Sequence, residues 1–584
     1  MLKKCIKNLS LVISILLVLS VISGCITKDK EDTKDKGASK LSDTISSEGD
    51  VRPMKDNLYL QGIPIVKNRE TFDLMITYGS GHVDTNDLPL YKEREERTNV
   101  KLNYIYVMST TLNERKMTMF ATNDFPDAMV GIIKNDDIVR YSPTGIFLPV
   151  DEYVDKYMPN LKKLMKEYPD VKGMSKMPDG KMYGFPRLNF WSVWPGGDTY
   201  INTTWIINQE WLDTLKLKTP ETTEEVKEVL MAFKTKDPNG NGKPDEIPYS
   251  FCYSDGRSFR ESMFGPFGLI GPGKKENVEN GKVFFVATDP RYKDVVKYVR
   301  DLYTNGLIDK EAFSHTREQF RSKGVQADPP IYGMTNGWMG DDEVGPRIRT
   351  PGNSDAPYVP MPPVAGPNGT RLWGNQIEGI VPHIFVVSSK CKSPETLARY
   401  VDELYSEDES VQECWGAFGE WVEKRDDGTY ARRITPEGRN TTEWMMESSS
   451  RMMPYALTDA LVERMRIQSY DMKIEDEAER KMEKNIIYLG KDAETKYIYS
   501  VVYAPYAKKE VYPGGVIRTP EEIDEIARLL PQIQNLIEKK EVEWMTGVAD
   551  IDAEYDDFIK KLKEYKIDRI TELYQAAYDR YMGK

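Results

Sequence analysis

Apolar and polar residues alternate regularly near the start of the folded part of this chain. In residues 71–78 (TFDLMITY) apolar side chains recur at every second position, which is the period of a half-buried strand. A helix is predicted over 87–99 and a second strand over 100–107. A further helix runs toward Ala121, and residues 123–130 form a turn that leads into a short strand. Strands that alternate with helices predict an α/β fold with a largely parallel sheet.

Several later helices are predicted from their first residues. Thr222 and Glu225 have the spacing of a capping box, in which each side chain bonds the backbone N–H of the other. The pairs 393–394 and 519–520 place Ser or Thr before a proline, which suits the first position of a helix. Residues 553–581 predict two charged amphipathic helices at the end of the chain.

The first 24 residues have the order of a secretory signal. Three lysines precede the apolar run 11–19, which is too short to span a membrane comfortably. Cys25 follows Ser23 and Gly24, and this site resembles a bacterial lipobox, in which the cysteine becomes the lipidated first residue. The resemblance implies a palmitate-type anchor at Cys25 on the extracellular face of the cell membrane, where two or more acyl chains give stable attachment.

The segment that follows is predicted to be a tether. Residues 26 to about 56 are charged, contain Ser and Gly, and are too poor in apolar side chains to order themselves. The lipidated Cys25 and the flexible tether are predicted to span 25–67. The folded body is expected to begin near residue 68. The whole chain has 584 residues, which is too long for one core and predicts at least two domains.

Charge and composition exclude some classes of function. The net charge is -13, and removal of Lys3, Lys4 and Lys7 with the signal gives -13 - 3 = -16. An acidic chain lacks the basic surface that nucleic acid requires, so no nucleic acid partner is expected. Aromatic residues make up 11%, including 10 Trp. This content suits a carbohydrate binder, although most such rings belong to protein cores.

Cysteine and histidine offer little chemistry. Beyond the signal and Cys25 the sequence holds Cys252, Cys391 and Cys414, whose spacing fits no zinc pattern, so buried free thiols are expected. The three histidines are far apart, and His383 is interpreted as a structural residue inside an apolar run.

The sharpest local motif is DPNGNGKPDE at 237–246. Oxygen-bearing side chains stand at loop positions 1, 3 and 5 with glycine at position 6, which is the first half of a calcium loop. Position 12 is Pro248, and no helix pattern follows, so we expect a structural site that holds a loop and no regular EF-hand. The alternative is a solvated turn rich in Asn, Asp and Gly. The expected ligands are Asp237, Asn239, Asn241, Lys243 through its backbone, Asp245 and Glu246.

The chain resembles the extracellular solute-binding lipoproteins of ABC sugar importers, in the long Gram-positive branch related to alginate-oligosaccharide binders. The resemblance covers most of the mature chain and rests on the order of motifs that are weak singly. These motifs are NDFPD at 123–127, DGKMYGFPR at 179–187, WIINQEWL at 205–212, the calcium-type loop, LYxxGLID at 302–309 and WGAFGE at 415–420.

This resemblance implies a type 2 periplasmic-binding fold, with two α/β lobes and a ligand cleft between them. The crossovers between lobes are expected near 184–189 and 374–381. The N-terminal lobe would then comprise 68–188 and 376–455, and the C-terminal lobe 189–375 and 456–584. Alginate binders in the family hold calcium in a loop that matches 237–246.

Ligand residues are predicted from family position and from strand ends. Open α/β sheets bind ligand beyond the carboxyl ends of their strands, which favours Tyr78 and Ser80. Trp338 resembles a sugar-stacking tryptophan of maltodextrin binders. The remaining candidates lie near the expected crossovers or carry groups that bond hydroxyls or a uronate: Trp191, Trp194, Asp341, Asp342, Arg371 and Trp373. A core ring or a solvated charge is the alternative for each.

The sequence therefore predicts a monomeric binding protein that captures an oligosaccharide and delivers it to ABC permease subunits. Closure on the solute needs differential affinity and no chemistry. A cell-surface glycoside hydrolase or lyase is the alternative from another class, although no GxSxG, HExxH or phosphate-loop motif is present. A binder of peptides or another solute would keep the same fold.

Overall fold

A computed structural model describes most of the chain from Arg52 onward, a part that forms one compact unit. The described residues are 52–78, 84–109, 111–189, 201, 203–255, 259–271, 275–337, 341–349, 355–374, 379–433, 444, 446–449, 452–458, 461 and 502–583. The predicted signal, Cys25 and the first half of the predicted tether lie outside these residues. Among the helices described, none is both long and apolar enough to cross a bilayer.

The folded body begins earlier than the predicted boundary at residue 67. A two-stranded hairpin, β1 (Met54–Lys55) and β2 (Leu58–Tyr59), opens it. Leu58, Ile65 and Val66 are buried in the core of the first sheet. Residues 58–66 (LYLQGIPIV) are much richer in apolar side chains than the charged segment before them, so the predicted boundary was placed too late in the chain.

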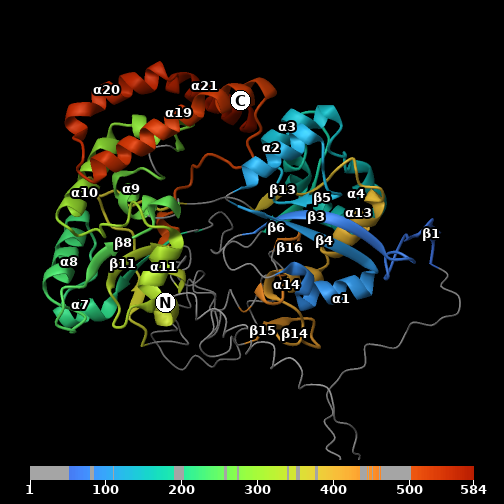
Figure 1. Ribbon diagram of the computed structural model, residues 1–584, viewed down its shortest axis with the longest axis horizontal. Helices are drawn as coiled ribbons and strands as arrows, with labels where there is room; N and C mark the ends of the chain where they lie inside the picture. The colour runs from blue at the N-terminus through green and yellow to red at the C-terminus, as the bar shows by residue number, and fades with distance from the viewer. Residues whose placement is uncertain are drawn as a thin grey trace, which may run out of the picture. The chain divides into compact units, whose positions relative to one another are not determined.

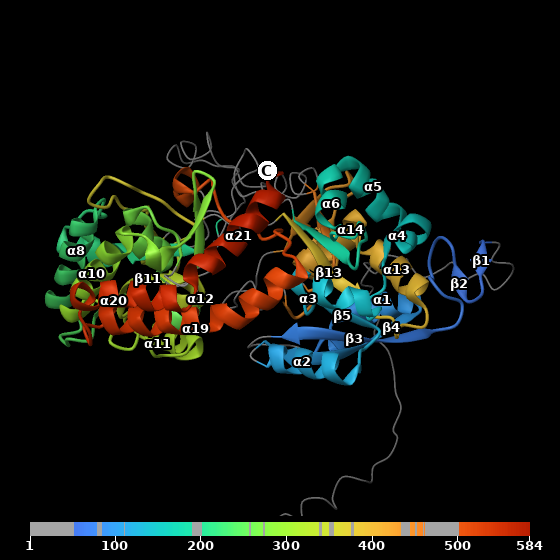
Figure 2. The same cartoon turned by 90° about the horizontal axis from the view of Figure 1, so that it is seen from above.

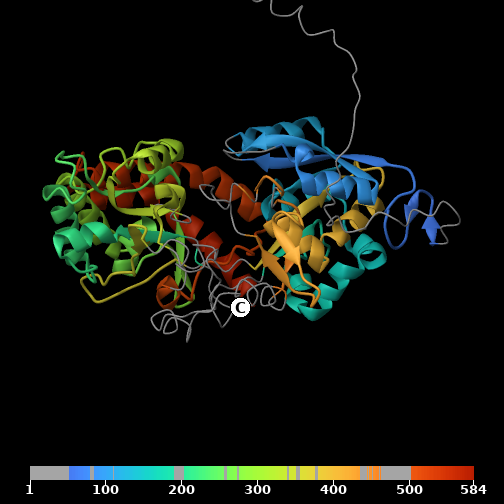
Figure 3. The ribbon, with the colours of Figure 1, turned by 90° about the horizontal axis from the view of Figure 1, so that it is seen from below.

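The first sheet has six strands in the order β16-β6-β13-β5-β3-β4 (Figure 1). Their bounds are β3 (Glu70–Tyr78), β4 (Val100–Met108), β5 (Ala128–Val130), β6 (Phe185–Asn189), β13 (Ile380–Val387) and β16 (Ala456–Leu457). The predicted pair β3 and β4 is parallel and in register over nine residues, and the two strands lie side by side in Figure 3.

The second sheet has four strands in the order β12-β7-β11-β8. They are β7 (Thr204–Asn208), β8 (Ile247–Ser250), β11 (Tyr332–Gly337) and β12 (Tyr358–Pro360). All residues of β7 and β11 are buried, as expected of strands in a sheet that is covered on both faces. A separate hairpin of β9 (Glu276–Glu279) and β10 (Lys282–Phe285) and another of β14 (Val422–Lys424) and β15 (Tyr430–Arg432) stand outside the two sheets.

Each sheet contains one strand that is antiparallel to its neighbours. The predicted largely parallel arrangement therefore holds only for the other strands. β13 is antiparallel to both β5 and β6, and β7 is antiparallel to both β11 and β12. A helical crossover keeps successive strands of one sheet parallel. β7 and β13 each follow a strand of the other sheet in sequence, so that constraint does not apply to them.

The helices alternate with the strands as the sequence predicted. Around the first sheet they are α1 (Pro89–Thr98), α2 (Leu112–Thr122), α3 (Asn135–Tyr141), α4 (Asp151–Tyr157), α5 (Pro159–Glu167), α6 (Pro169–Met174), α13 (Pro394–Glu403) and α14 (Glu407–Trp415). Around the second they are α7 (Gln209–Leu215), α8 (Thr223–Thr235), α9 (Arg260–Phe264), α10 (Arg291–Thr304), α11 (Arg317–Gln326) and α12 (Asp341–Val344).

The predicted caps are confirmed in part. Thr519 and Glu522 form a complete capping box at the start of α19 (Pro520–Met545). At α8 the Thr222 hydroxyl accepts the N–H of Glu225, but the Glu225 carboxylate accepts the N–H of Glu221. Helix α13 begins at the predicted proline without a side-chain bond from its N-cap serine.

Three helices close the chain. α19, α20 (Ile551–Glu564) and α21 (Ile567–Tyr581) pack against one another, and α19 and α20 also pack against α10 (Figure 2). Their apolar faces supply Ile533, Ile537, Trp544, Phe558 and Ile570 to the same core as the second sheet. The predicted pair of amphipathic helices over 553–581 is therefore confirmed.

One helix of the first sheet is capped from a distant part of the sequence. The N-cap position of α5 is Met158, whose side chain makes no capping bond. The side chain of Asp402 in α13 caps the helix instead. Asp402 Oδ1 accepts the N–H of Leu161 at 3.0 Å, and Asp402 Oδ2 accepts the N–H of Asn160 at 3.2 Å. A carboxylate at a helix N-terminus satisfies N–H groups that would otherwise stay without partners.

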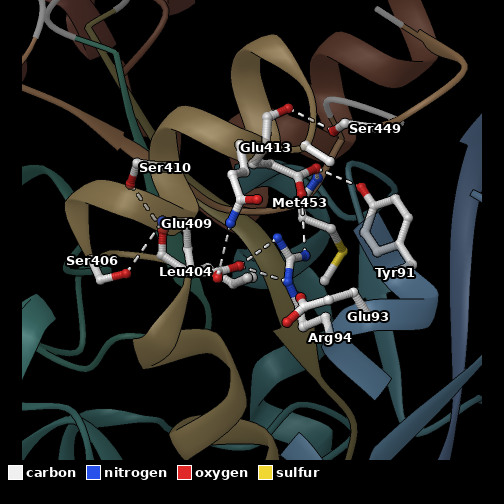
Figure 4. A network of polar contacts seen from close by, with 12 residues as sticks. Tyr91, Glu93, Arg94, Leu404, Ser406, Glu409, Ser410, Glu413, Ser449 and Met453 are labelled. Atoms are coloured by element: carbon white, nitrogen blue, oxygen red, sulfur yellow. Dashed lines mark hydrogen bonds and ion pairs between the residues drawn. The ribbon is translucent and has the colours of Figure 1, made fainter. Parts of the chain in front are cut away.

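A buried ion-pair network joins α1 to α14 (Figure 4). The Arg94 guanidinium donates to Glu409 at 2.9 Å and to Glu413 at 3.2 Å. The Tyr91 hydroxyl and the backbone N–H of Met453 donate to the other oxygen of Glu413 at 2.7 and 3.3 Å. Arg94 and Glu413 are 1% and 0% exposed, so each charge depends on the other for compensation.

Candidate functional site

The carboxyl ends of the parallel strands locate the first candidate site. β3 ends at Tyr78, the first of the predicted ligand residues, and β11 ends at Gly337, directly before Trp338. The Glu343 carboxylate of α12 occupies the space beside Gly337, where an added Cβ would lie 1.8 Å from its Cδ. Glu343 is 1% exposed and has little room to withdraw. Only glycine fits at this strand end.

Most of the predicted ligand side chains lie outside the described residues. Ser80, Trp191, Trp194 and Trp338 belong to this group. Tyr78 is placed as the last residue of β3, and Asp341 and Asp342 open α12, but their side chains are not described. Their contact with ligand stays a prediction.

Arg371 lies at the surface beside the start of α8. Its guanidinium is 3.7 Å from the Glu221 carboxylate, and the two side chains are 30% and 78% exposed. A loose pair of this exposure contributes little to stability. Among the described residues, Arg371 pairs with Glu221, which was not predicted to bind ligand, and with none of the predicted ligand residues.

Trp373 lies in the core of the second sheet. It is fully buried, its ring stacks on Tyr503 at 4.3 Å between centroids, and its Nε1–H donates to the carbonyl of Thr203 at 3.2 Å. Both the ring and its polar atom are thus satisfied by protein. This packing gives Trp373 a structural role beside the second predicted crossover, and a contact with ligand gains no support from it.

Next to Trp373 is a buried carboxylate that sequence reasoning missed. Glu261 of α9 is 4% exposed, and its Oε1 is 2.9 Å from Arg260 Nε. Its Oε2 is buried without a hydrogen-bond partner. Burial raises the pKa of Glu261, and the Arg260 charge opposes that rise. One glutamate among 93 acidic residues carries no sequence signal, so only the fold singles it out.

The two predicted crossovers meet as neighbouring strands. Leu188 of β6 lies opposite Ile380 of β13, and Arg187 lies opposite Val381. The register then shifts before Phe385, and His383 lies within this irregularity.

His383 is predicted to be a structural histidine, but only one of its two ring nitrogens has a hydrogen-bond partner. Its Nε2 is 3.1 Å from the Met177 sulfur, and its Nδ1 has no partner. Burial lowers the pKa of His383 to about 4, so the ring is neutral near pH 7.

The second candidate site is the loop between α8 and β8. A strand follows the loop, which agrees with the prediction that it is no regular EF-hand. Asp237, Gly240 and Gly242 all have positive φ angles, and these bend the loop back on itself. Side-chain oxygens of Asp237, Asn239 and Asn241 accept backbone N–H groups of the same loop at 2.8–3.1 Å.

The loop gathers oxygen atoms and negative charge. Asn239 and Asn241 both donate their amides to the Asp245 carboxylate at 2.9–3.1 Å, and these bonds lower the pKa of Asp245. Burial raises the pKa of Glu246, and the neighbouring charges of Asp237 and Asp245 raise it further.

A divalent cation fits this donor set. Glu246 Oε1 is buried without a hydrogen-bond partner, so the loop holds an oxygen that lacks compensation. The carboxylates of Asp237, Asp245 and Glu246 repel one another, and a cation would relieve that repulsion. All of the donors are hard oxygen atoms, the ligands that calcium prefers. The residues present therefore fit calcium.

A different group of acidic residues is already paired with a lysine. Asp309, Glu311 and His315 bring ligand-type atoms within 4.8 Å of one another. Lys323 Nζ donates to both carboxylates, at 3.0 Å to Asp309 and 2.6 Å to Glu311. His315 Nε2 bonds the carbonyl of Phe251 at 2.7 Å. One lysine thus bridges both carboxylates and offsets part of their charge, so these residues form an internal network of ion pairs.

Comparisons with known proteins agree on one protein family. Residues 85–410 match the family described as bacterial extracellular solute-binding protein. The fructooligosaccharide ABC transporter substrate-binding protein FusA of Streptococcus pneumoniae is 29% identical over 508 residues, which is 86% of this chain and 88% of FusA. The polygalacturonan/rhamnogalacturonan-binding protein YtcQ of Bacillus subtilis is 26% identical over 59% of this chain and 65% of YtcQ.

Solved structures agree with this assignment. FusA in complex with kestose matches with a TM-score of 0.75 and 28% identity, over 88% of this chain and 100% of that one. A FusA EF-hand mutant in complex with fructo-nystose matches with a TM-score of 0.74. The alginate-binding protein AlgQ2, at 22% identity and a TM-score of 0.67, shares the fold over 88% of this chain and 99% of its own. The chain thus has the predicted α/β fold of solute-binding proteins.

Proposed function

This chain belongs to the bacterial extracellular solute-binding protein family, and we propose that it is the oligosaccharide-binding subunit of an ABC transporter. The likeness to FusA carries the proposal, because it extends over 86% of this chain and its structure holds kestose. The solute would be bound and then delivered to the membrane permease. Binding shifts the protein toward the state that has the higher affinity, and no bond of the solute needs to break.

The solute class proposed first is a neutral fructooligosaccharide. FusA is matched over more of the chain than YtcQ, whose name refers to uronate-containing polymers. A uronate-containing chain is the second candidate, and the likeness to YtcQ supports it. The two candidates differ in charge, so a cleft built for a uronate would need a cationic partner for the carboxylate.

A thermal-shift screen of the unlipidated mature chain separates these candidates. The panel contains kestose, fructo-nystose, trigalacturonate, alginate trisaccharide and a tripeptide. A ligand at a hundred times its dissociation constant adds about 2.7 kcal/mol to the stability of the state that binds it. We expect kestose or fructo-nystose to give the largest shift. A shift with trigalacturonate alone would move the assignment to uronates, and a shift with the peptide alone would refute the carbohydrate class.

Trp338 remains the first aromatic residue proposed to stack on the sugar. It directly follows β11, whose last residue Gly337 lies against the carboxylate of the buried Glu343. Loss of a stacked ring costs about 1–3 kcal/mol in comparable aromatic contacts. Trp338→Ala should therefore weaken binding of the best panel sugar by at least fivefold, and an unchanged affinity would return Trp338 to a structural role.

Calcium is proposed as a structural ion of the loop 237–246. Two independent facts support it: the uncompensated Glu246 oxygen, and the FusA variant that is described as an EF-hand mutant. When bound, the ion would hold together the segment that joins α8 to β8 and so the second sheet. Asp237, Asn239, Asn241, Asp245 and Glu246 would supply side-chain oxygens, and Lys243 its carbonyl.

Attachment to the membrane through Cys25 is proposed from the sequence alone. The mature chain would be anchored by acyl groups on Cys25, with residues 26–51 as the tether before the hairpin β1–β2. Cells that express Cys25→Ala should incorporate no labelled palmitate into the protein. They should release the protein to the medium. Undiminished labelling would refute this part of the proposal.

A further inference from the structure

A groove of about 530 Å³ lies on the second sheet's side of the molecule, between α19 and the segment after β8. Its volume falls within the range of about 300–1,000 Å³ that small-molecule sites occupy. Eight residues line it: Tyr253, Ser254, Phe313, Asn535, Glu538, Lys539, Val542 and Glu543. None of them belongs to the predicted solute or calcium sites.

One wall of the groove is aromatic and rigid. Tyr253 and Phe313 are half-buried, with ring centroids 5.4 Å apart. Behind them, Tyr253 stacks on Phe259 at 5.8 Å, and Phe313 meets Phe251 edge-on at 5.4 Å. Both rings are therefore supported on their protein side by a larger aromatic cluster, and the surface they leave exposed lines the groove.

A buried carboxylate fixes the orientation of Tyr253. Its hydroxyl donates to Glu541 Oε1 at 3.0 Å, and Tyr292 donates to the other oxygen at 2.9 Å. Glu541 is 1% exposed, so this anchor is held inside the core. A ring that is already oriented loses little conformational entropy when a ligand packs on it.

The opposite wall is one face of α19. Asn535, Glu538, Lys539 and Val542 recur at intervals of three and four residues, which places them on the same side of the helix. Glu543 is paired with Lys540 at 2.8 Å and lies 3.8 Å from Lys539. The charged groups of this wall are thus of both signs, and the wall offers neither a cationic nor an anionic surface.

These two walls have the chemistry of a saccharide site. A sugar ring presents C–H groups on its faces, which pack on aromatic rings, and hydroxyls on its rim, which bond amide and carboxylate oxygens. A charged ligand would need a wall of one sign. We propose that the groove binds one unit of a neutral oligosaccharide, as a second and weaker site. This inference rests on the proposed function, because the solute is taken to be of the same class.

The groove is remote from the end of α19 that faces the first sheet. Ile523 near the start of α19 packs in a core cluster with Met177 and Val386. Lys539 lies about 24 Å further along the helix, at 1.5 Å per residue. A chain held in the groove would raise the local concentration of saccharide near the protein without occupying the solute site.

The proposal is tested by equilibrium dialysis of the unlipidated mature chain with kestose. The kestose concentration extends to roughly 20 mM, because a weak site of mM affinity requires concentrations of that order. The variant Asn535→Ala/Glu538→Ala removes two of the hydrogen-bonding side chains of the helix wall and leaves both rings in place. The matched control is Asp557→Asn/Lys560→Ala, an exposed pair on α20. We expect two kestose molecules per chain in the wild type and the control, and one in the groove variant.

The outcomes separate the groove from the proposed function. One molecule per chain in all three proteins would overturn the groove site and leave the function intact. One molecule in the wild type and none in the groove variant would support the groove and contradict a kestose-binding solute site. No binding in any of them would contradict both. As a second variant, Val542→Trp should fill the groove and also lose the weaker site, and two bound molecules in Val542→Trp would contradict the proposal.

Discussion

The carboxylate of Glu261 lies against the backbone of Gly374, where an added Cβ would be 2.5 Å from Glu261 Oε1. Gly374 directly follows the buried Trp373 at the second predicted crossover, so a residue of α9 restricts what the crossover can carry. Glycine is required here for space and not for a left-handed backbone.

The first prediction concerns this contact. Gly374→Ala should lower the free energy of unfolding by about 1–3 kcal/mol, because the buried Glu261 has little room to move. Shortening the acid by Glu261→Ala should relieve the clash, so the double variant should lose less stability than the sum of the two single variants. Urea unfolding of the four proteins measures this coupling, and strictly additive losses would show that the close approach has no energetic effect.

The second prediction concerns the loop 237–246. Asp237→Ala should lower the melting temperature more when calcium is present than in a chelator, because the chelated protein loses only the bond from the Gly242 N–H and the calcium-bound protein loses a ligand as well. Wild-type protein should gain about 2.7 kcal/mol at a calcium concentration a hundred times the dissociation constant. Asp557→Ala, an exposed acid on α20, is the control. Equal melting temperatures of the wild type with calcium and with chelator would contradict a calcium site in this loop.

The third prediction concerns Asp402, the residue that caps α5. Burial raises its pKa to about 6, above the ordinary value of 3.8, although the N–H groups of Leu161 and Asn160 oppose the rise. A raised carboxyl pKa means that the folded state binds the proton more tightly. The stabilisation is complete below about pH 4 and is lost as the pH rises through 6.

Asp402→Asn keeps an acceptor for the cap and removes the titration. The stability of the wild type relative to Asp402→Asn should therefore fall by about 2–3 kcal/mol between pH 4 and pH 6.5. Asp402→Ala should cost about 1 kcal/mol or more relative to Asp402→Asn at every pH, since the cap is then absent. Chemical unfolding across this pH range provides the test. A difference between wild type and Asp402→Asn that does not vary with pH would contradict the assigned pKa.

The fourth prediction concerns the network of Figure 4. Arg94→Ala should cost about 3–5 kcal/mol near pH 7, because the carboxylates of Glu409 and Glu413 stay buried without their cation. Burial already raises the pKa of Glu413, and loss of Arg94 removes the charge that opposes this rise. The deficit should therefore shrink as the pH falls toward 5.

Arg97→Ala is the matched control, because Arg97 contacts the same Glu409 but is 28% exposed. It should cost less than about 1 kcal/mol. Unfolding curves at pH 7 and pH 5 give both comparisons. Equal losses for the two arginine variants would show that burial does not set the strength of this network.

Local sequence patterns predicted the parts of the fold that local interactions determine. The alternation in residues 71–78 identified β3, and Thr519 before Pro520 identified the start of α19. The calcium-type loop was found because its oxygen-bearing residues are adjacent in sequence.

Other features join residues that are far apart in sequence, and no local pattern encodes them. Asp402 caps a helix that starts at residue 159, and Glu261 meets Gly374 across a hundred residues. The reversed direction of β13 likewise depends on the path between the two sheets. The aromatic candidates illustrate the same limit: the position of Trp373 beside the expected crossover made it a candidate sugar contact, yet it packs on Tyr503 in the core.

The central claim is that this chain binds an oligosaccharide and releases it unchanged. Isothermal titration of the unlipidated mature chain with kestose in the presence of calcium, followed by chromatography of the recovered sugar, tests it most directly. The account predicts a high-affinity site that binds one kestose per chain, and recovery of intact kestose. Hydrolysed sugar would establish an enzyme, and the absence of high-affinity binding for kestose, fructo-nystose and trigalacturonate would contradict the assignment as a sugar-binding transport protein.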